Sequence, residues 1–395
     1  MSKSDVTPIT FYGAPMSLYS GKARAYFRKQ GIPFKEVMPG HKTFLEDVAK
    51  KVQRRVVPVI EIDNGSSDST LIQDTVDIID HFENKADKRF SVYPQTPLQK
   101  LTALIIDLFG SEGLLKTAMH YRWSFLKENE GFIRYEFGDH AAPGTGRETV
   151  EAVADHVMGQ MQAYLPKMDI TERTIPAIEA QYADLLELLN KHFEHHPYLL
   201  GGLPSVGDYG LFAPMYAHLA RDPYPSNIMK CKAQRVYRWV ERMNAENSDM
   251  PEYPDYAETF CSDDEIPETL GPVLQLIAAD FLPEMQRTVA EINSWLEENA
   301  EVKSGTCVTA KPHLKTLGEM NYPMRGTEFK GMVIPYRLYM LQRITDAYEA
   351  MTVDDKAKAN SFFDAVGLKD MLTLKAKRRV NRENHIEVWG NEINV

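Results

Sequence analysis

The stretch ITFYGAPMSLYSGKARAYFRKQGIPFKEV, residues 9–37, decides the fold because it reads as strand, helix and strand. Residues 8–12 are rich in β-branched and aromatic side chains and predict a strand, which Gly13 ends. Apolar residues then recur at helical spacing and predict a helix over about 20–31. A short strand, residues 33–37, follows. This order predicts a parallel pair of strands joined by a helix.

The alternation continues over the next fifty residues. The segments VVPVIEID (56–63) and STLIQ (69–73) predict two strands that lie close together in sequence and therefore form a hairpin. The segment DTVDIIDHFE (74–83) predicts a helix that begins near Asp74. Residues 1–88 are therefore expected to form one thioredoxin-like α/β domain.

The rest of the chain predicts helices. An irregular linker with two prolines, RFSVYPQTP (89–97), separates the two parts. Helical patterns cover 98–126, 148–167, 175–195 and 206–220, and a capping box of Ser205 and Asp208 opens the last of them. We expect an all-helical second domain over 97–260. Residues 261–395 predict a helical extension packed on it, with one long helix kinked at Pro283 and another over 336–348.

Composition narrows the class of protein. The chain has 395 residues, of which 43% are hydrophobic and 26% charged, and a net charge of −11 argues against a nucleic-acid partner. The one basic cluster, KAKRRVNR (375–382), is interpreted as a solvated face. Three scattered cysteines, no signal-peptide pattern and no membrane span predict a cytoplasmic protein with buried or half-buried thiols.

Ser17 and Ser20 lie three residues apart, at the junction of the predicted first strand and first helix. The first turn of a helix has free N–H groups and a partial positive charge, which favour a thiolate or another anion. A hydroxyl that donates to such a thiolate would stabilise it further, so Ser17 fits a site that activates a bound thiol. The alternative is that Ser17 and Ser20 only cap the helix.

Two further segments fit the binding of a peptide-like ligand. A cis bond between Val57 and Pro58 would turn the Val57 backbone outward to pair with an extended ligand, whereas a trans bond would mark only a strand start. Gln73 and Asp74 offer an amide and a carboxylate at a helix start, where they would hold an amino-acid head group. The alternative for Asp74 is a helix cap.

Two other clusters have plainer interpretations. His192, His195 and His196 end a helix without a carboxylate to complete a set of ligands, and no metal site is predicted. The aromatic run around Tyr121 and Trp123 fits a core better than a pocket.

Taken together, SLYSGKAR, VVPVI, LIQDT and YLLGGLPSVGDYGLF resemble the glutathione S-transferase superfamily, in the order and spacing of that family over residues 8–250. The resemblance implies a thioredoxin-like first domain and an all-α second domain, here with extra C-terminal helices. It implies Ser17 at the position of the catalytic serine or cysteine, with Tyr12 as the rival hydroxyl. It also implies that Val57, beside cis-Pro58, pairs with the cysteinyl part of glutathione, and that Gln73 and Asp74 hold the γ-glutamyl group.

The implied activity is that of a serine-type glutathione transferase. Glutathione would be the co-substrate, and its thiolate would attack an apolar electrophile between the domains, with Tyr121 and Trp123 as candidate contacts. A homodimer and a detoxification role are further implications. The alternative is a non-catalytic glutathione-binding or scaffold protein. Asp74 departs from the serine more usual in the family, and the role of residues 261–395 stays open.

Overall fold

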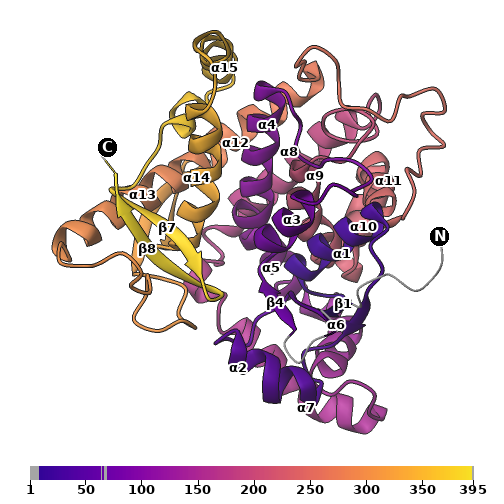
Figure 1. Cartoon of the computed structure of the whole chain (residues 1–395). Helices are drawn as coiled ribbons and strands as arrows, with labels where there is room; N and C mark the ends of the chain where they lie inside the picture. The colour runs from indigo at the N-terminus through magenta and orange to yellow at the C-terminus, as the bar shows by residue number, and fades with distance from the viewer. Residues whose placement is uncertain (1–8, 64, 66–68, 394–395) are drawn as a thin grey trace.

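The first domain is a four-stranded sheet with helices on both faces (Figure 1). In this computed structural model, the described residues are 9–63, 65 and 69–393. The elements are β1 (Ile9–Tyr12), α1 (Leu18–Gln30), β2 (Lys35–Val37), η1 (Phe44–Val48, a π-helical turn), α2 (Ala49–Lys51), β3 (Val59–Ile62), β4 (Thr70–Gln73) and α3 (Thr75–Glu83). The strand order is β2-β1-β3-β4. The strand expected from residue 8 begins at Ile9, and Pro8 lies outside the described residues.

Strand pairing confirms the predicted α/β unit. β1 and β2 are parallel, and β3 pairs antiparallel with both β1 and β4. Because side chains alternate along a strand, Phe11 packs with Phe27 of α1, and Tyr12 packs with Phe44 on the opposite face. The two faces of the sheet are therefore covered by α1 and by the η1–α2 segment.

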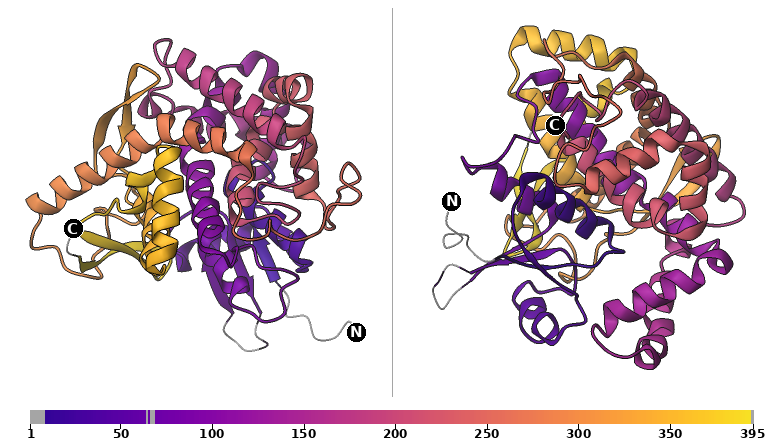
Figure 2. Two further views of the ribbon diagram at one scale, coloured as in Figure 1. Left: turned by 90° about the horizontal axis from the view of Figure 1, so that it is seen from above. Right: turned by 90° about the vertical axis from the view of Figure 1, so that its right-hand side faces the viewer.

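The second region is helical, as predicted. Its elements are α4 (Pro97–Leu108), η2 (Phe109–Gly113), α5 (Leu115–Trp123), α6 (Leu126–Ala141), α7 (Arg147–Gln162), η3 (Pro166–Met168), α8 (Ile175–His192), α9 (Val206–Pro214), η4 (Met215–Ala220), α10 (Pro223–Lys232) and α11 (Gln234–Asn244). The capping box of Ser205 and Asp208 is present at the start of α9. Of these helices, α6 and α10 were not expected from the sequence. Figure 2 shows α6 and α7 side by side as a projecting helical hairpin.

The C-terminal extension contains the expected helices and also two β-hairpins that were not expected. Its elements are η5 (Glu268–Leu270), α12 (Gly271–Asp280), α13 (Leu282–Glu298), β5 (Glu319–Met324), β6 (Thr327–Met332), α14 (Tyr336–Glu349), α15 (Val353–Ala365), η6 (Lys369–Leu372), β7 (Arg378–Glu383) and β8 (Ile386–Glu392). The long helix expected through Pro283 is two helices instead. A proline inside a helix lacks an N–H and clashes with the preceding turn, so Pro283 lies in the first turn of a new helix.

The extension contacts both preceding regions. α14 packs beside α4, as both views in Figure 2 indicate. The β7–β8 hairpin reaches from the extension toward β4 and α2 of the first domain (Figure 1). The extension therefore does more than cover the second domain.

The expectation that the thiols are buried or half-buried is wrong for Cys231, and the expectation for the basic cluster is wrong for Arg382. Cys231 is exposed, whereas Cys261 and Cys307 are half-buried, and all three are free thiols. The basic cluster is a solvated face only in part, because the Lys377 side chain is 49% exposed whereas the Arg382 side chain is only 4% exposed. Within the described residues, no helix is long and apolar enough to cross a bilayer.

Candidate active site

Three strand ends bring the predicted site residues to one edge of the sheet. Tyr12 ends β1 and pairs with Val59, the first residue of β3. Val59 also pairs with Gln73, the last residue of β4. The loop after β1, Pro58 before β3 and Asp74 after β4 therefore meet at this edge. This is the edge from which α1 and α3 start.

Ser17 is the N-cap residue of α1. Its backbone is extended, and its hydroxyl oxygen accepts a hydrogen bond from the Ser20 amide at 3.3 Å. This cap uses an oxygen lone pair and leaves the O–H free to donate. Within the described part of the chain, the Ser17 hydroxyl donates to no protein group, and the residue is half-buried. Capping and donation to a ligand are therefore compatible roles.

Ser20 has a different role from the one predicted. Its hydroxyl oxygen accepts from the Ala14 amide at 3.2 Å, and the residue is fully buried. Ser20 thus fixes the loop that leads into α1, whereas the helix cap belongs to Ser17.

Tyr12, the rival hydroxyl, donates to Glu61 at 2.8 Å. The ring is buried on the α2 face of the sheet against Phe44. Burial, together with the hydrogen bond and charge of Glu61, raises the pKa of Tyr12 well above its usual range. The Tyr12 hydroxyl is therefore committed to a protein carboxylate.

A third hydroxyl near the start of α1, that of Tyr19, was not predicted as a candidate. It donates to the Glu112 carboxylate at 3.1 Å and lies 3.3 Å from the Ser111 carbonyl oxygen. Burial raises the pKa of Tyr19 well above its usual value. Of the three candidate hydroxyls, those of Tyr12 and Tyr19 are both directed at protein carboxylates.

The Val57–Pro58 bond is cis. The Pro58 carbonyl accepts a hydrogen bond from the Asp74 amide at 3.4 Å, which joins the start of β3 to the start of α3. Val57 is half-buried and Pro58 is buried.

Asp74 caps α3, as the sequence predicted, and its backbone is unusual. Its carboxylate accepts from the Val76 amide at 2.9 Å. Its φ of 90° lies in a region that favours glycine. Such backbone is held only where the surroundings enforce it, and it occurs preferentially at ligand sites.

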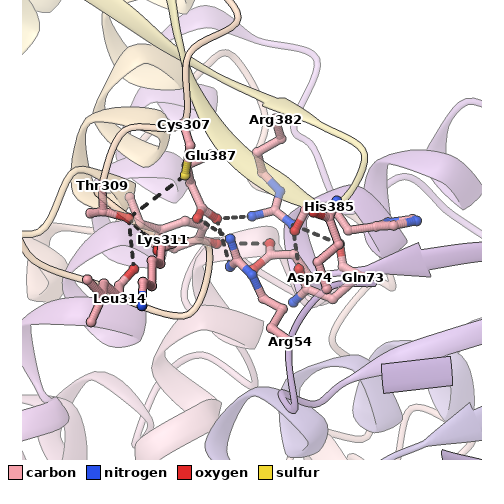
Figure 3. Close-up of polar contacts among 12 residues, drawn as sticks. Arg54, Gln73, Asp74, Cys307, Thr309, Lys311, Leu314, Arg382, His385 and Glu387 are labelled. Carbon is pink, nitrogen blue, oxygen red and sulfur yellow. Dashed lines mark hydrogen bonds and ion pairs between the residues drawn. The ribbon is translucent and has the colours of Figure 1, made fainter. Parts of the chain in front are cut away.

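The C-terminal extension contacts Gln73 and Asp74 directly (Figure 3). The Arg382 guanidinium donates through Nη2 to the Gln73 side-chain oxygen at 2.6 Å and contacts the Gln73 carbonyl oxygen at 3.2 Å. The Tyr336 hydroxyl donates to Asp74 Oδ1 at 2.9 Å. The two residues predicted to hold an amino-acid head group thus already have partners from this chain.

The same hairpin also contacts the segment before Pro58 (Figure 3). Arg54 and Glu387 form a two-point ion pair, with Arg54 Nη2 2.7 Å from Oε2 and Nη1 3.3 Å from Oε1. The two side chains are 10% and 11% exposed. Gln53 donates to the Asn384 carbonyl in the hairpin turn at 3.2 Å. Arg54, Tyr336, Arg382 and Glu387 were missed by sequence reasoning.

Arg382 also contacts a half-buried carboxylate of α3, that of Asp77. Asp77 accepts from Arg382 Nε at 2.8 Å and from the Tyr339 hydroxyl at 2.7 Å. Burial, and next the charge of Asp74, raise the pKa of Asp77, and Arg382 acts in the opposite direction. The site therefore has a cation-accepting character at the Gln73 end.

An apolar cluster includes residues of the loop before Ser17. Its buried members are Ala14, Met16, Met119, Trp123, Ile133, Phe137, Ala154 and Met158. Trp123 thus belongs to this cluster. Tyr121 instead belongs to the main core, where it stacks with Phe125.

The Arg122 side chain fixes the loop before Ser17. It forms a buried ion pair with Asp222 and donates to the carbonyl oxygens of Met16 at 3.3 Å and of Ala217 at 2.8 Å. A lone arginine inside an aromatic run does not signal this role, so sequence reasoning missed it.

The histidine-rich end of α8 is a core feature. His192 contacts the Thr269 hydroxyl at 2.9 Å and the Tyr198 carbonyl oxygen at 3.2 Å, so its ring nitrogens are satisfied in the neutral form. Burial, with a smaller effect from His196, lowers the pKa of His192 to about 3. No cluster of three or more metal-binding side chains is found within the described residues.

This burial predicts an acid-sensitive stability. The unfolded state binds a proton at His192 below a pKa of about 6.5, whereas the folded state does not until about pH 3. Stability from this residue is therefore complete above pH 6.5 and falls by about 1.4 kcal/mol per pH unit as the pH drops toward 3. Urea unfolding of His192→Gln from pH 7 to 4.5 should show a shallower dependence than the native chain. The exposed His195→Gln is the control, and equal slopes for all three proteins would refute the assignment.

Several solved structures are similar to part of this chain at low sequence identity. A possible glutathione S-transferase from Rhodopseudomonas palustris has 15% identity and a TM-score of 0.34, covering 66% of this chain and 99% of that one. The β-etherase LigF from Sphingobium sp. strain SYK-6 has 14% identity and a TM-score of 0.37, covering 62% and 97%. A glutathione S-transferase from Methylobacterium radiotolerans, solved with glutathione sulfonate, has 15% identity and a TM-score of 0.35, covering 65% and 98%. No curated protein sequence matches the chain significantly.

A family comparison concerns the first domain. Residues 11–90 match the family model "Glutathione S-transferase, N-terminal domain". The match spans the strand ends, the cis-proline and the start of α3 described above. By this match, residues 11–90 are similar to the N-terminal domain of glutathione S-transferases, and an all-helical region follows them in the chain.

Proposed function

We propose that the chain is a glutathione transferase in which the Ser17 hydroxyl stabilises the thiolate of bound glutathione. The observation that carries this proposal is the Ser17 hydroxyl itself. It lies at the N-terminus of α1 and keeps its proton for a ligand, whereas Tyr12 and Tyr19 donate to carboxylates. A thiolate beside Ser17 meets a hydroxyl donor and the positive end of a helix.

The N-terminus of α1 and the hydrogen bond from Ser17 are together large enough to lower the pKa of a bound thiol appreciably. The helix N-terminus favours an anion by about 0.3 to 1 kcal/mol, and a hydrogen bond to a charged group contributes about 1.5 to 3 kcal/mol. At about 1.36 kcal/mol per pKa unit, the sum lowers the pKa of a thiol by about one to three units from about 8.5. A shift of more than about 1.5 units within this range would leave most of the bound thiol ionised at pH 7.

Gln73, Asp74 and Val57 are the proposed binding residues for the rest of glutathione. The amide oxygen of Gln73 and the carboxylate of Asp74 suit the ammonium of the γ-glutamyl group, and the positive N-terminal end of α3 suits its carboxylate. The Val57 backbone, beside cis-Pro58, suits pairing with the cysteinyl part as a strand would.

The proposed reaction is nucleophilic substitution or addition at an electrophilic carbon. The thiol releases its proton to solvent on binding, and Ser17 donates its hydrogen bond to the resulting thiolate. The sulfur lone pair then forms a carbon–sulfur bond, and a leaving group such as chloride departs with the bonding electrons. The methionine-rich cluster around Met16 and Trp123 is the proposed contact surface for an apolar electrophile.

The test is conjugation of glutathione to an aryl halide such as 1-chloro-2,4-dinitrobenzene, followed by the absorbance of the product. We expect turnover by the full chain that depends on Ser17. A second candidate function is non-catalytic glutathione binding, which is favoured by the contacts of Arg382 and Tyr336 with the proposed binding residues. Calorimetric binding of glutathione without turnover on a broad panel of electrophiles would support that alternative and overturn the transferase.

Two further properties belong to this proposal. We expect a homodimer, which light scattering of the full chain would test, and a detoxification role in the cytoplasm. Three free thiols support a reducing compartment.

A further inference from the structure

The tip of the β7–β8 hairpin presents one cation and one anion to the proposed glutathione site. Arg382 of β7 pairs with Glu387 of β8, close to the turn at Asn384 and His385. Both side chains point into the first domain (Figure 3). Glutathione itself carries one ammonium and two carboxylate groups. The hairpin thus offers charges of the same signs as the ligand.

Arg382 occupies the proposed place of the ligand's cation. Its guanidinium donates to the Gln73 side-chain oxygen, the acceptor proposed for the γ-glutamyl ammonium. It also pairs with Asp77 through Nε and with Glu387 through Nη1. Its donors are therefore already directed at protein acceptors, so it is poorly placed to bind a ligand carboxylate.

Glu387 occupies a place suited to the ligand's anion. It forms the two-point ion pair with Arg54, four residues before cis-Pro58. A guanidinium in such a fork binds a carboxylate with good geometry whether it comes from protein or ligand. Arg54 Nε is buried and has no hydrogen-bond partner within the described residues. The pairing with Glu387 thus leaves Arg54 incompletely satisfied.

We propose that the β7–β8 hairpin is an internal ligand of the glutathione site, and that glutathione binds by displacing the hairpin tip from Gln73 and Arg54. This inference rests on the proposed function of the site. In the closed state, the hairpin tip contacts Gln73 and Arg54. Tyr336 stabilises this state because its hydroxyl donates a hydrogen bond to Asp74 Oδ1. The contact is therefore an autoinhibitory one.

The hairpin is built so that its tip can move while its base stays in place. The base is anchored in the extension, where Trp389 stacks on Trp295 and Val380 forms backbone hydrogen bonds with the Gln342 side chain. The tip is a tight turn in which Asn384 and His385 have positive φ angles of 48° and 69°. Its contacts with the first domain are polar, and water or glutathione can replace polar partners.

The expected effect follows from competition. If only a fraction of molecules has the tip displaced, the measured dissociation constant is the intrinsic one divided by that fraction. Weakening the closed state should therefore tighten glutathione binding. A hairpin that only joined the extension to the first domain would affect stability and leave this constant unchanged.

The test is calorimetric titration of glutathione into the full chain and three variants. Arg382→Ala removes the proposed cation, and we expect a dissociation constant about tenfold lower, as for a closed state that dominates by about ten to one. Glu387→Gln keeps the shape of the side chain, and we expect a decrease of about threefold or more by the same relation. Arg379→Ala is the matched control, because Arg379 lies on the same strand and pairs with Asp346 of the extension. Its constant should equal that of the native chain.

The outcomes separate this inference from the proposed function. Glutathione binding that is unchanged or weaker in folded Arg382→Ala and Glu387→Gln would overturn the inference and leave the transferase proposal standing. If Arg382→Ala does not fold, Glu387→Gln decides. Absence of glutathione binding in all four proteins would overturn both. Because coupling is reciprocal, glutathione should also speed amide hydrogen exchange at residues 381–387 of the native chain, and unchanged exchange at saturation would overturn the inference.

Discussion

Replacing Ser17 with alanine is expected to lower kcat/KM for aryl halide conjugation by about ten- to hundredfold. The hydroxyl is proposed to donate a hydrogen bond to a thiolate, which contributes about 1.5 to 3 kcal/mol, and about 1.36 kcal/mol corresponds to a factor of ten in rate. The pH–rate profile should move to higher pH in this variant, because the bound thiol ionises less readily. Steady-state kinetics from pH 6 to 9 would measure both effects.

Two controls keep this prediction specific. Tyr12→Phe should retain activity within about twofold, the range of a distant substitution, because the Tyr12 hydroxyl donates to Glu61. Ser17→Thr should recover part of the rate, since it restores a hydroxyl. Loss of the cap in Ser17→Ala costs about 1 kcal/mol of helix stability, so its circular dichroism spectrum must match that of the native chain. A large loss in Tyr12→Phe with little loss in Ser17→Ala would reverse the assignment.

Ser17→Cys should in addition gain thiol-transferase activity.

Asp208→Ala is expected to cause the largest loss of stability, about 4 kcal/mol or more, as for a broken buried hydrogen-bond network. The carboxylate accepts from the Leu199 and Ser205 amides at 3.0 and 2.8 Å, from the Ser205 hydroxyl at 2.9 Å and from the Trp239 indole at 3.2 Å. All of these donors are buried, and each loses its acceptor in the variant. Urea unfolding followed by tryptophan fluorescence would measure the loss.

A matched control is available in the extension. Asp355 shares a hydrogen bond with the Thr352 hydroxyl at the exposed start of α15. Asp355→Ala should cost no more than about 1 kcal/mol, because water replaces the lost contact. Asp208→Asn keeps one acceptor oxygen and should fall between the two. Equal losses for Asp208→Ala and Asp355→Ala would show that the buried network contributes little.

The first domain and its site edge were predictable because their signals are local. The strand that ends at Tyr12, the proline at position 58 and the helix that starts after Asp74 each follow from a few neighbouring residues. Thioredoxin-like pairing then brings these segments to one edge. The hydrogen-bond partners of the Ser17 and Tyr12 hydroxyls, on which the proposal of Ser17 rests, could not be predicted from the sequence.

The contacts of the extension were not predictable by the same means. Arg382 and Gln73 are 309 positions apart, and Tyr336 and Asp74 are 262 apart, so no local periodicity reports their meeting. The hairpin itself did have a signal. The segment RRVNRENHIEVWGNE (378–392) has Val380 before, and Ile386, Val388 and Trp389 after, the pair Asn384 and His385, which is suited to a tight turn. Its three arginines are also typical of a solvated, charged face, so the sequence alone does not distinguish the two.

The pKa of the thiol in bound glutathione tests the central claim most directly. The ultraviolet absorbance of the thiolate, followed from pH 4 to 10 in the native chain and in Glu387→Gln, gives this value. We expect a pKa about one to three units below the value of about 8.5 for a free thiol, and a return toward 8.5 in Ser17→Ala. A bound thiol that titrates at about 8.5 in the native chain and in Glu387→Gln, with or without the Ser17 hydroxyl, would contradict the account.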